Sequence, residues 1–183
     1  MNEVMNKPTG IVTILSHTGT YDFDTNEVKN GIIIEKREYK NLIVNRSSAI
    51  LSSAILPKNN MAITHLAVGI GEGDGLMPIE DITKTSLVKE VYRVEIDRYG
   101  LIDSNGKIID INHVDNVSGS ILKASIKDIG NYELVEMGLF GGIGAEYEGS
   151  GIMFNYKTFS NWVVPEDASL TIVWRLYFGQ RNK

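Results

Sequence analysis

Apolar and polar positions alternate along residues 169–178, near the end of the chain. Leucine, isoleucine, tryptophan and phenylalanine occupy the even positions, and the odd positions carry a mixture of polar and apolar residues. A period of two places successive side chains on opposite faces of a β-strand. We therefore predict a strand that packs one face on a core, with Trp174 on that apolar face as a core residue. The preceding Pro165-Glu166-Asp167 predicts a turn.

The same period predicts further short strands. They fall at residues 11–15, 31–34, 63–70, 91–96, 101–102, 108–109, 117–129, 132–140 and 152–159. Asn105-Gly106 stands between two of these apolar runs, and this dipeptide favours a tight hairpin because both residues tolerate positive φ.

One segment, residues 45–56, has a different period. Its apolar residues fall at positions 50, 51, 54 and 55, which is helical spacing. Asn45 or Ser47 is a suitable N-cap, and Pro57 ends the pattern. We predict an amphipathic helix of about three turns whose apolar stripe packs on the sheet. Residues 83–89 are predicted to form either a second short helix or a loop.

These patterns predict an all-β or β-dominated fold, an antiparallel β-sandwich with one packed amphipathic helix at about residues 45–56. The sequence contains no internal repeat and no linker long enough to separate two domains. Its first 25 residues are rich in Gly, Thr, Asn and Asp, a composition that suits an N-terminal arm.

The composition excludes several classes of function. The 183 residues include no cysteine, so zinc-thiolate sites, disulfides and cysteine nucleophiles are excluded. Eighteen Lys and Arg stand against 23 Asp and Glu, a net charge of −5, which disfavours nucleic-acid binding. The sequence shows no signal peptide and no membrane-length apolar stretch, so we expect a soluble protein made in a cytoplasm, without membrane contact.

The glycine run at residues 69–75 follows a predicted strand, as a phosphate-binding loop would. Its spacing is G-x-G-x-G-x-G, however, with no Lys-Ser/Thr after it and with two acidic side chains, Glu72 and Asp74, that would repel phosphate. We interpret the run as a flexible surface loop. A nucleotide role and a cation site at Glu72 and Asp74 remain as alternatives.

No residue cluster points to catalysis. His17, His65 and His113 lie far apart and form no H-x-x-x-H motif, and the chain has no G-x-S-x-G motif. Paired acids occur at several places, and the sequence distinguishes none of these pairs: Asp22 and Asp24, Glu133 and Glu136, Glu146 and Glu148. We therefore predict no catalytic, cofactor-binding or metal-binding residue, no cofactor, and a protein that is not an enzyme.

Several short motifs follow one another in a fixed order. Glu-Met-Gly-Leu-Phe at 136–140, Gly-Ile-Met-Phe at 151–154, Thr-Phe at 158–159 and Leu-Thr-Ile-Val-Trp at 170–174 make up the second half of this order. With residues 40–45, 63–71 and 87–93 upstream, the set resembles small virion structural proteins of tailed bacteriophages, which carry an E-x-G-L-F … L-T-I-x-W pattern. The resemblance spans roughly residues 38–179.

The motifs also predict how the strands pack. Residues 136–140 and 151–154 should pair across the glycine-rich residues 141–150, with Gly138 at a bulge or a close backbone approach. We expect one core set from these strands and the last strand: Leu139, Phe140, Met153, Phe154, Phe159, Leu170, Ile172 and Trp174.

The resemblance implies a structural component of a bacteriophage virion or phage-tail-like particle. Such a protein acts as an oligomeric adaptor, a trimer or ring, in the tail, baseplate, collar or fibre-attachment region. Its partners would be its own copies and other virion structural proteins, with no nucleic acid and no membrane, and it would reside in the virion after synthesis in the bacterial host cytoplasm. Residues 1–35 lie outside the resemblance and are predicted as an N-terminal arm or attachment segment, with residues 36–183 as the β-sandwich body.

Three alternatives remain beside this interpretation. One is a carbohydrate-binding or host-surface-binding β-sandwich module, and another is a head-associated decoration protein. The third is a small hydrolase or lyase of the cell envelope, which would need a cleft with two acids or a His-acid pair.

Overall fold

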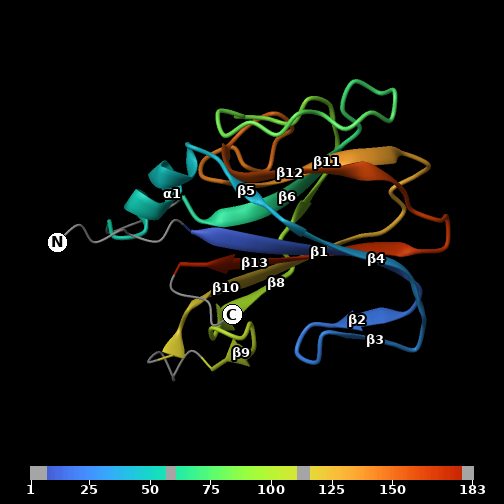
Figure 1. Ribbon diagram of the computed structural model, residues 1–183, viewed down its shortest axis with the longest axis horizontal. Coiled ribbons are helices and arrows are strands. Elements are labelled where there is room, and N and C mark those ends of the chain that lie inside the picture. Colours follow the sequence, from blue (N-terminus) through green and yellow to red (C-terminus); the bar gives the residue numbers. More distant parts are fainter. Residues whose placement is uncertain (1–7, 57–60, 111–115, 179–183) are drawn as a thin grey trace.

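The protein folds as two antiparallel sheets packed face to face, with a small hairpin and one short helix (Figure 1). The computed structural model describes residues 8–56, 61–110 and 116–178. The six-stranded sheet has the order β4-β1-β13-β10-β8-β9, and the five-stranded sheet has the order β5-β12-β11-β6-β7. The predicted β-dominated sandwich is therefore confirmed.

The strand bounds follow the alternating segments of the sequence. The six-stranded sheet contains β1 (Thr9–His17), β4 (Ile33–Lys40), β8 (Arg98–Ile102), β9 (Ile108–Ile109), β10 (Gly119–Ile126) and β13 (Ser169–Tyr177). The five-stranded sheet contains β5 (Leu42–Ile43), β6 (Ile63–Gly69), β7 (Glu90–Glu95), β11 (Glu133–Gly141) and β12 (Ile152–Val163). A separate hairpin pairs β2 (Thr20–Asp22) with β3 (Glu27–Lys29).

Two predicted hairpins are confirmed. β8 and β9 pair across the Asn105-Gly106 turn, in which Gly106 has φ +82°. β11 and β12 pair across the glycine-rich segment, with register shifts in β11 on both sides of Gly138. Residues 83–89 form no helix and belong to a long connection between β6 and β7.

The main core lies between the two sheets. Trp174 and Ile172 of β13 are fully buried there against Leu139 of β11 and Phe154 of β12. Side chains of this size contribute about 1.5–3 kcal/mol each when they leave water completely. The even-numbered face of β13 is thus the core face that the alternation predicts.

The opposite face of β13 is also covered. Val173 and Tyr177 are buried in a second cluster, outside the six-stranded sheet, with Tyr21 and Phe23 from the β2–β3 hairpin. A central strand covered on both faces carries apolar residues on both, which explains the mixed odd positions of its sequence.

The structure corrects the predicted boundary between an arm and a body. β1 runs antiparallel between β4 and β13, and nine residue pairs join it to β13, from Thr9 opposite Tyr177 to His17 opposite Ser169. Residues 9–17 and 33–35 are therefore part of the six-stranded sheet, and residues 20–29 cover it. The average composition of this segment gave the wrong prediction because it combines a short β-branched strand with the glycine-rich and asparagine-rich turns beside it.

The helix is shorter and less well packed than predicted. α1 spans Ser47–Ser53, and Ala54 is its C-cap. Within it only Ile50 reaches the main core, while Ile55, just after the helix, is 86% exposed. Among the described residues, no helix is long and apolar enough to span a membrane.

The single predicted core set is divided between two faces. Phe140 and Met153 lie outside the five-stranded sheet in a third cluster with Val44 and Tyr156, whereas Leu139 lies in the main core. Adjacent strand residues point to opposite faces, so Leu139 and Phe140 cannot share a core layer. The β6–β7 connection, at the top of Figure 1, contributes Leu87 to this outer cluster.

Candidate functional site

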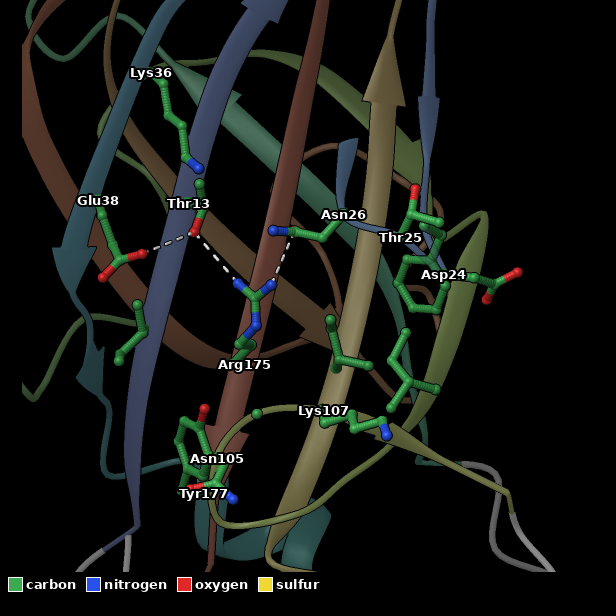
Figure 2. Close-up of a pocket in the computed structure, with 15 residues that line it drawn as sticks. Thr13, Asp24, Thr25, Asn26, Lys36, Glu38, Asn105, Lys107, Arg175 and Tyr177 are labelled. Carbon is green, nitrogen blue, oxygen red and sulfur yellow. Dashed lines mark hydrogen bonds between the residues drawn. The ribbon is translucent and has the colours of Figure 1, made fainter. Parts of the chain in front are cut away.

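A polar cleft of about 410 Å³ opens on the outer face of the six-stranded sheet. We call it the outer cleft. β1, β4 and β13 supply its floor, and the β2–β3 turn and the β8–β9 turn form its two walls (Figure 2). Polar side chains line much of it: Thr13, Asp24, Thr25, Asn26, Lys36, Glu38, Asn105, Lys107 and Arg175.

Arg175 occupies the centre of the floor. Its Nη1 donates to Thr13 Oγ1 at 3.3 Å and its Nη2 donates to Asn26 Oδ1 at 3.0 Å, as Figure 2 shows. Thr13 Oγ1 in turn donates to Glu38 Oε2 at 3.3 Å. Among the described residues no carboxylate lies within ion-pair distance of Arg175, so its guanidinium has only neutral oxygen partners.

The β2–β3 turn positions the first wall. Asn26 adopts φ +58°, in the left-handed region that Asn tolerates better than most residues. Its side-chain oxygen accepts the Tyr21 hydroxyl as well as Arg175, and these bonds hold the turn over the sheet. Burial raises the pKa of Tyr21, and the nearby Arg175 partly opposes this effect.

Asp22 stabilises the same turn from the solvent side. Its carboxylate accepts the Lys29 ammonium and the backbone N–H groups of Thr25 and Asp24. These hydrogen bonds, chiefly the one from Lys29, lower the pKa of Asp22 to about 2. Asp22 thus serves the geometry of the turn, while Asp24, the other acid of this pair, lies 3.5 Å from Arg98.

The β8–β9 turn forms the second wall. Asp103 Oδ1 accepts the backbone N–H groups of Asn105 and Lys107, both at 2.9 Å. Gly106 lies directly on the floor, since a Cβ there would stand 2.8 Å from the Tyr177 hydroxyl. Glycine is required at this position both for its positive φ and for this close approach.

The outer cleft is locally positive in an acidic chain. Lys36, Lys107 and Arg175 stand against Asp24 and Glu38, which gives 3 − 2 = +1, whereas the whole chain carries −5. Lys36, Lys107 and Glu38 are exposed at the rim, and Arg175 is half-buried. The arrangement suits a small ligand that combines one negative charge with neutral hydrogen-bonding groups.

A second feature lies on the other outer face, where residues 70–89 join β6 to β7. We call this segment the β6–β7 loop. Glu136 of β11 is completely buried beneath it and accepts backbone N–H groups from Gly71 at 3.3 Å and from Val88 and Lys89 at 3.0 Å each. One carboxylate thus fixes both ends of a long irregular segment to the sheet.

Tyr156 completes this arrangement from β12. Its hydroxyl donates to Glu136 Oε2 at 2.8 Å. Burial first, and then the hydrogen bond and negative charge of Glu136, raise the pKa of Tyr156 far above its ordinary value. The buried carboxylate therefore has four donors, as a buried charge requires.

Further charged contacts hold the rest of this outer layer. Glu80 of the β6–β7 loop accepts Lys157 Nζ at 2.5 Å and the backbone N–H of Thr158 at 3.1 Å. Arg93 of β7 forms a buried ion pair with Glu90 at 2.6 Å and stacks 4.1 Å above the ring of Phe140.

Arg93 also fixes the glycine-rich segment between β11 and β12. Its Nη1 donates to the carbonyl oxygens of Ala145 at 2.6 Å and Ser150 at 3.0 Å. The two loops on this face are therefore held by charge-assisted hydrogen bonds to the sheet.

The β6–β7 loop presents apolar side chains to solvent although it is fixed at several points. Ile79 is 87% exposed, and Leu76, Met77 and Ile82 are also exposed. A segment of this length without regular structure is unusual inside a compact domain and is commonly functional. Clustered exposed apolar side chains are typical of a protein-binding surface.

The structure places His17 and His65 in different sheets. His17 is buried in β1, with Nε2 2.9 Å from Thr171 Oγ1, and His65 lies in β6 with Nδ1 2.9 Å from Thr64 Oγ1. His113 lies outside the described residues. In the part of the chain that the structure describes, no group of three His, Asp or Glu side chains is arranged to hold a metal ion.

The glycine run forms the start of the β6–β7 loop. Gly71, Gly73 and Gly75 all have positive φ, and Asp74 Oδ1 accepts the backbone N–H of Leu76 at 2.9 Å. The run is thus a series of turns on the surface, and Glu72 is exposed. The contact of Glu136 with the Gly71 N–H holds the first part of this run against the sheet.

Sequence reasoning missed the outer cleft and the role of Glu136. A signal for the cleft was present: Arg175 is the one charged residue on a strand that is otherwise neutral from Ser169 to Tyr177. For Glu136 the signal was an acid inside the apolar run 134–140, where a solvated carboxylate would be out of place.

Comparisons of the chain with protein-family models, curated proteins and solved structures find no match.

Proposed function

We propose that this protein is a structural, non-enzymatic component of a bacteriophage virion or phage-tail-like particle. It acts as an oligomeric adaptor in the tail, baseplate, collar or fibre-attachment region. The resemblance of the ordered motifs to small virion proteins of tailed bacteriophages supports this proposal.

The observation that carries the proposal is the exposed apolar surface of the β6–β7 loop. Glu136 and Glu80 fix the loop backbone, so Leu76, Met77 and Ile79 are presented in a preformed arrangement. A preformed surface loses little conformational entropy when a partner binds, which favours association. The proposed occupant is a second copy of the chain within a closed ring or trimer.

The motif residue Glu136 connects the two lines of support. It is the first residue of the E-x-G-L-F pattern and the residue that holds the β6–β7 loop. Under the proposal, that motif serves to position the contact surface between subunits.

The oligomeric mass of the full chain tests the proposal. Sedimentation should give a multimer, and replacing Met77 and Ile79 together by Ser should convert it to a monomer that unfolds at the same temperature. Ile55→Ser is the matched control, because Ile55 is 86% exposed against 87% for Ile79 and belongs to a different segment, just after α1. The control should keep the multimer.

Other outcomes contradict the proposal. A multimer that dissociates with Ile55→Ser and not with the loop variant would place the interface at the helix. A wild-type chain that is monomeric and absent from purified particles, as judged by particle imaging and mass spectrometry, would overturn the assembly role itself.

A further inference from the structure

We propose that the outer cleft is a binding site for a carboxylate-bearing sugar, a monosaccharide-sized ligand of the uronic-acid type. The site is independent of the β6–β7 loop, which lies on the opposite outer face of the sandwich, so the inference does not depend on the proposed assembly role.

The size of the cleft favours a small ligand. Its volume of about 410 Å³ lies near the lower end of the range for small-molecule sites. Two turns bound it, the β2–β3 turn held by Asp22 and the β8–β9 turn held by Asp103. Its walls are thus fixed by local hydrogen bonds before any ligand arrives.

Arg175 provides the recognition of a carboxylate. Its guanidinium has five N–H donors in a planar fork, and its two hydrogen bonds, to Thr13 and Asn26, use only some of them. A half-buried guanidinium with neutral partners gains most from an anionic acceptor, because the ion pair forms where water is partly excluded. Lys36 and Lys107 add positive charge at the rim.

Glu38 and Asp24 limit the negative charge that the ligand can carry. Both carboxylates line the same cleft, so a phosphate dianion or a peptide with several acids would meet repulsion from them. A hydroxyl group, in contrast, can donate to Glu38, which keeps acceptor capacity beside its bond from Thr13.

The neutral groups of the cleft suit a ligand rich in hydroxyls. Thr25 and the amides of Asn26 and Asn105 offer both donors and acceptors, as Figure 2 shows for their positions around Arg175. A sugar hydroxyl also donates and accepts. One carboxylate on Arg175, with hydroxyls on Glu38 and the amides, therefore matches the anionic, cationic and amide groups named here.

A pair of matched ligands tests the inference on the full-length protein. Glucuronate and glucose differ only in a carboxylate in place of a hydroxymethyl group, so their titrations, followed by NMR chemical shifts, isolate the charge. Glucuronate should shift signals of the cleft residues at millimolar concentration, and glucose should bind at least tenfold more weakly, which corresponds to about 1.4 kcal/mol.

Two variants locate the site. Arg175→Gln should weaken glucuronate binding by about tenfold to a hundredfold, as expected for loss of charge-assisted hydrogen bonds. Arg175 also bridges two structural elements, so a second variant is needed that changes only exposed rim residues. The double variant Lys36→Gln with Lys107→Gln should weaken glucuronate binding, by about tenfold at most. Lys127→Gln, exposed and outside the cleft, is the control and should leave binding unchanged.

Four results would overturn the inference. These are the absence of glucuronate binding, equal binding of glucose, binding that both cleft variants leave unchanged, and tighter binding of inorganic phosphate or of a short Asp/Glu peptide than of glucuronate. Loss of the multimer in the loop variant, with sugar binding intact, would show that the two proposals stand or fall separately.

Discussion

The two sheets of this sandwich are covered on their outer faces by different means. Outside the six-stranded sheet, the β2–β3 hairpin covers the surface with the aromatic rings of Tyr21 and Phe23. Outside the five-stranded sheet, the covering segments are loops, and buried charged groups hold them, chiefly Glu136 and the pair of Glu90 and Arg93. One cover relies mainly on burial of apolar area and the other mainly on hydrogen bonds to charges.

The difference explains what each face can do. The apolar cover is formed by the rings of Tyr21 and Phe23, so the turn between β2 and β3 is left to shape a polar cleft at its edge. A cover held by charged hydrogen bonds fixes the backbone of the loop, so its apolar side chains are free to face solvent. The outer cleft therefore lies beside the cover made of apolar side chains, and the exposed apolar surface lies on the cover held by charged hydrogen bonds.

The largest effect on stability is expected from removing β1 together with the β2–β3 hairpin, which forms the apolar cover. Deleting residues 1–30 removes β1 and the β2–β3 hairpin, which exposes the edge of β13 and the outer cluster. The loss should exceed the total stability of a typical domain, about 5–15 kcal/mol. Far-ultraviolet circular dichroism and solubility measure the result, and deletion of residues 1–7, which keeps all of β1, is the control. A soluble, cooperatively folding deletion variant would show that β1 is dispensable.

A smaller effect is expected at the charged cover. Glu136→Gln keeps the shape of the side chain and removes the charge that four donors share, which should lower the free energy of unfolding by about 2–3 kcal/mol. Urea unfolding measures this change, and proteolysis within residues 70–89 should become faster. Glu133→Gln, on the same strand and exposed, should change stability little. Equal stability of the two variants would contradict the role given to Glu136.

The smallest effect is expected on the free energy of unfolding at alkaline pH, where one buried tyrosine at each cover, Tyr21 or Tyr156, contributes. The pKa values of Tyr21 and Tyr156 are raised in the folded state, so the unfolded chain loses these protons first, near pH 10. Their contribution to stability is complete below about pH 10 and is lost as pH rises above it. Glu136 adds to the rise at Tyr156, whereas Arg175 opposes it at Tyr21.

Phenylalanine variants separate these two contributions. Tyr156→Phe should flatten the alkaline loss of stability more than Tyr21→Phe, as measured by urea unfolding between about pH 9 and pH 11. Exposed Tyr147→Phe is the control. A larger change from Tyr21→Phe would mean that the apolar cover is the more sensitive to ionisation.

Much of the strand pattern was predictable from the sequence because it depends on local order. Alternation identified β13 and the core position of Trp174, and Asn105-Gly106 identified the β8–β9 hairpin. Helical spacing located α1 but predicted a longer helix than the one observed. The length of a helix in a protein depends mostly on the tertiary packing of its apolar face, which spacing does not reveal. Only Ile50 of that face reaches the main core.

The candidate sites were not predictable in the same way. Arg175 and Asn26 are 149 positions apart, and the chain brings them within 3.0 Å only because the hairpin folds over the sheet. Glu136 looked like one member of an unremarkable acid pair, and its importance comes from backbone groups at residues 71, 88 and 89 that carry no side-chain signature.

The sequence by itself determined that this chain is a β-sandwich, because residue periodicity decides which side chains share a strand face. Only the tertiary structure decided which strands are neighbours, including the place of β1 beside β13. It also decided what covers each outer face, because pairing and covering depend on contacts between residues that are distant along the chain and close in space. The outer cleft and the surface of the β6–β7 loop belong to this second class.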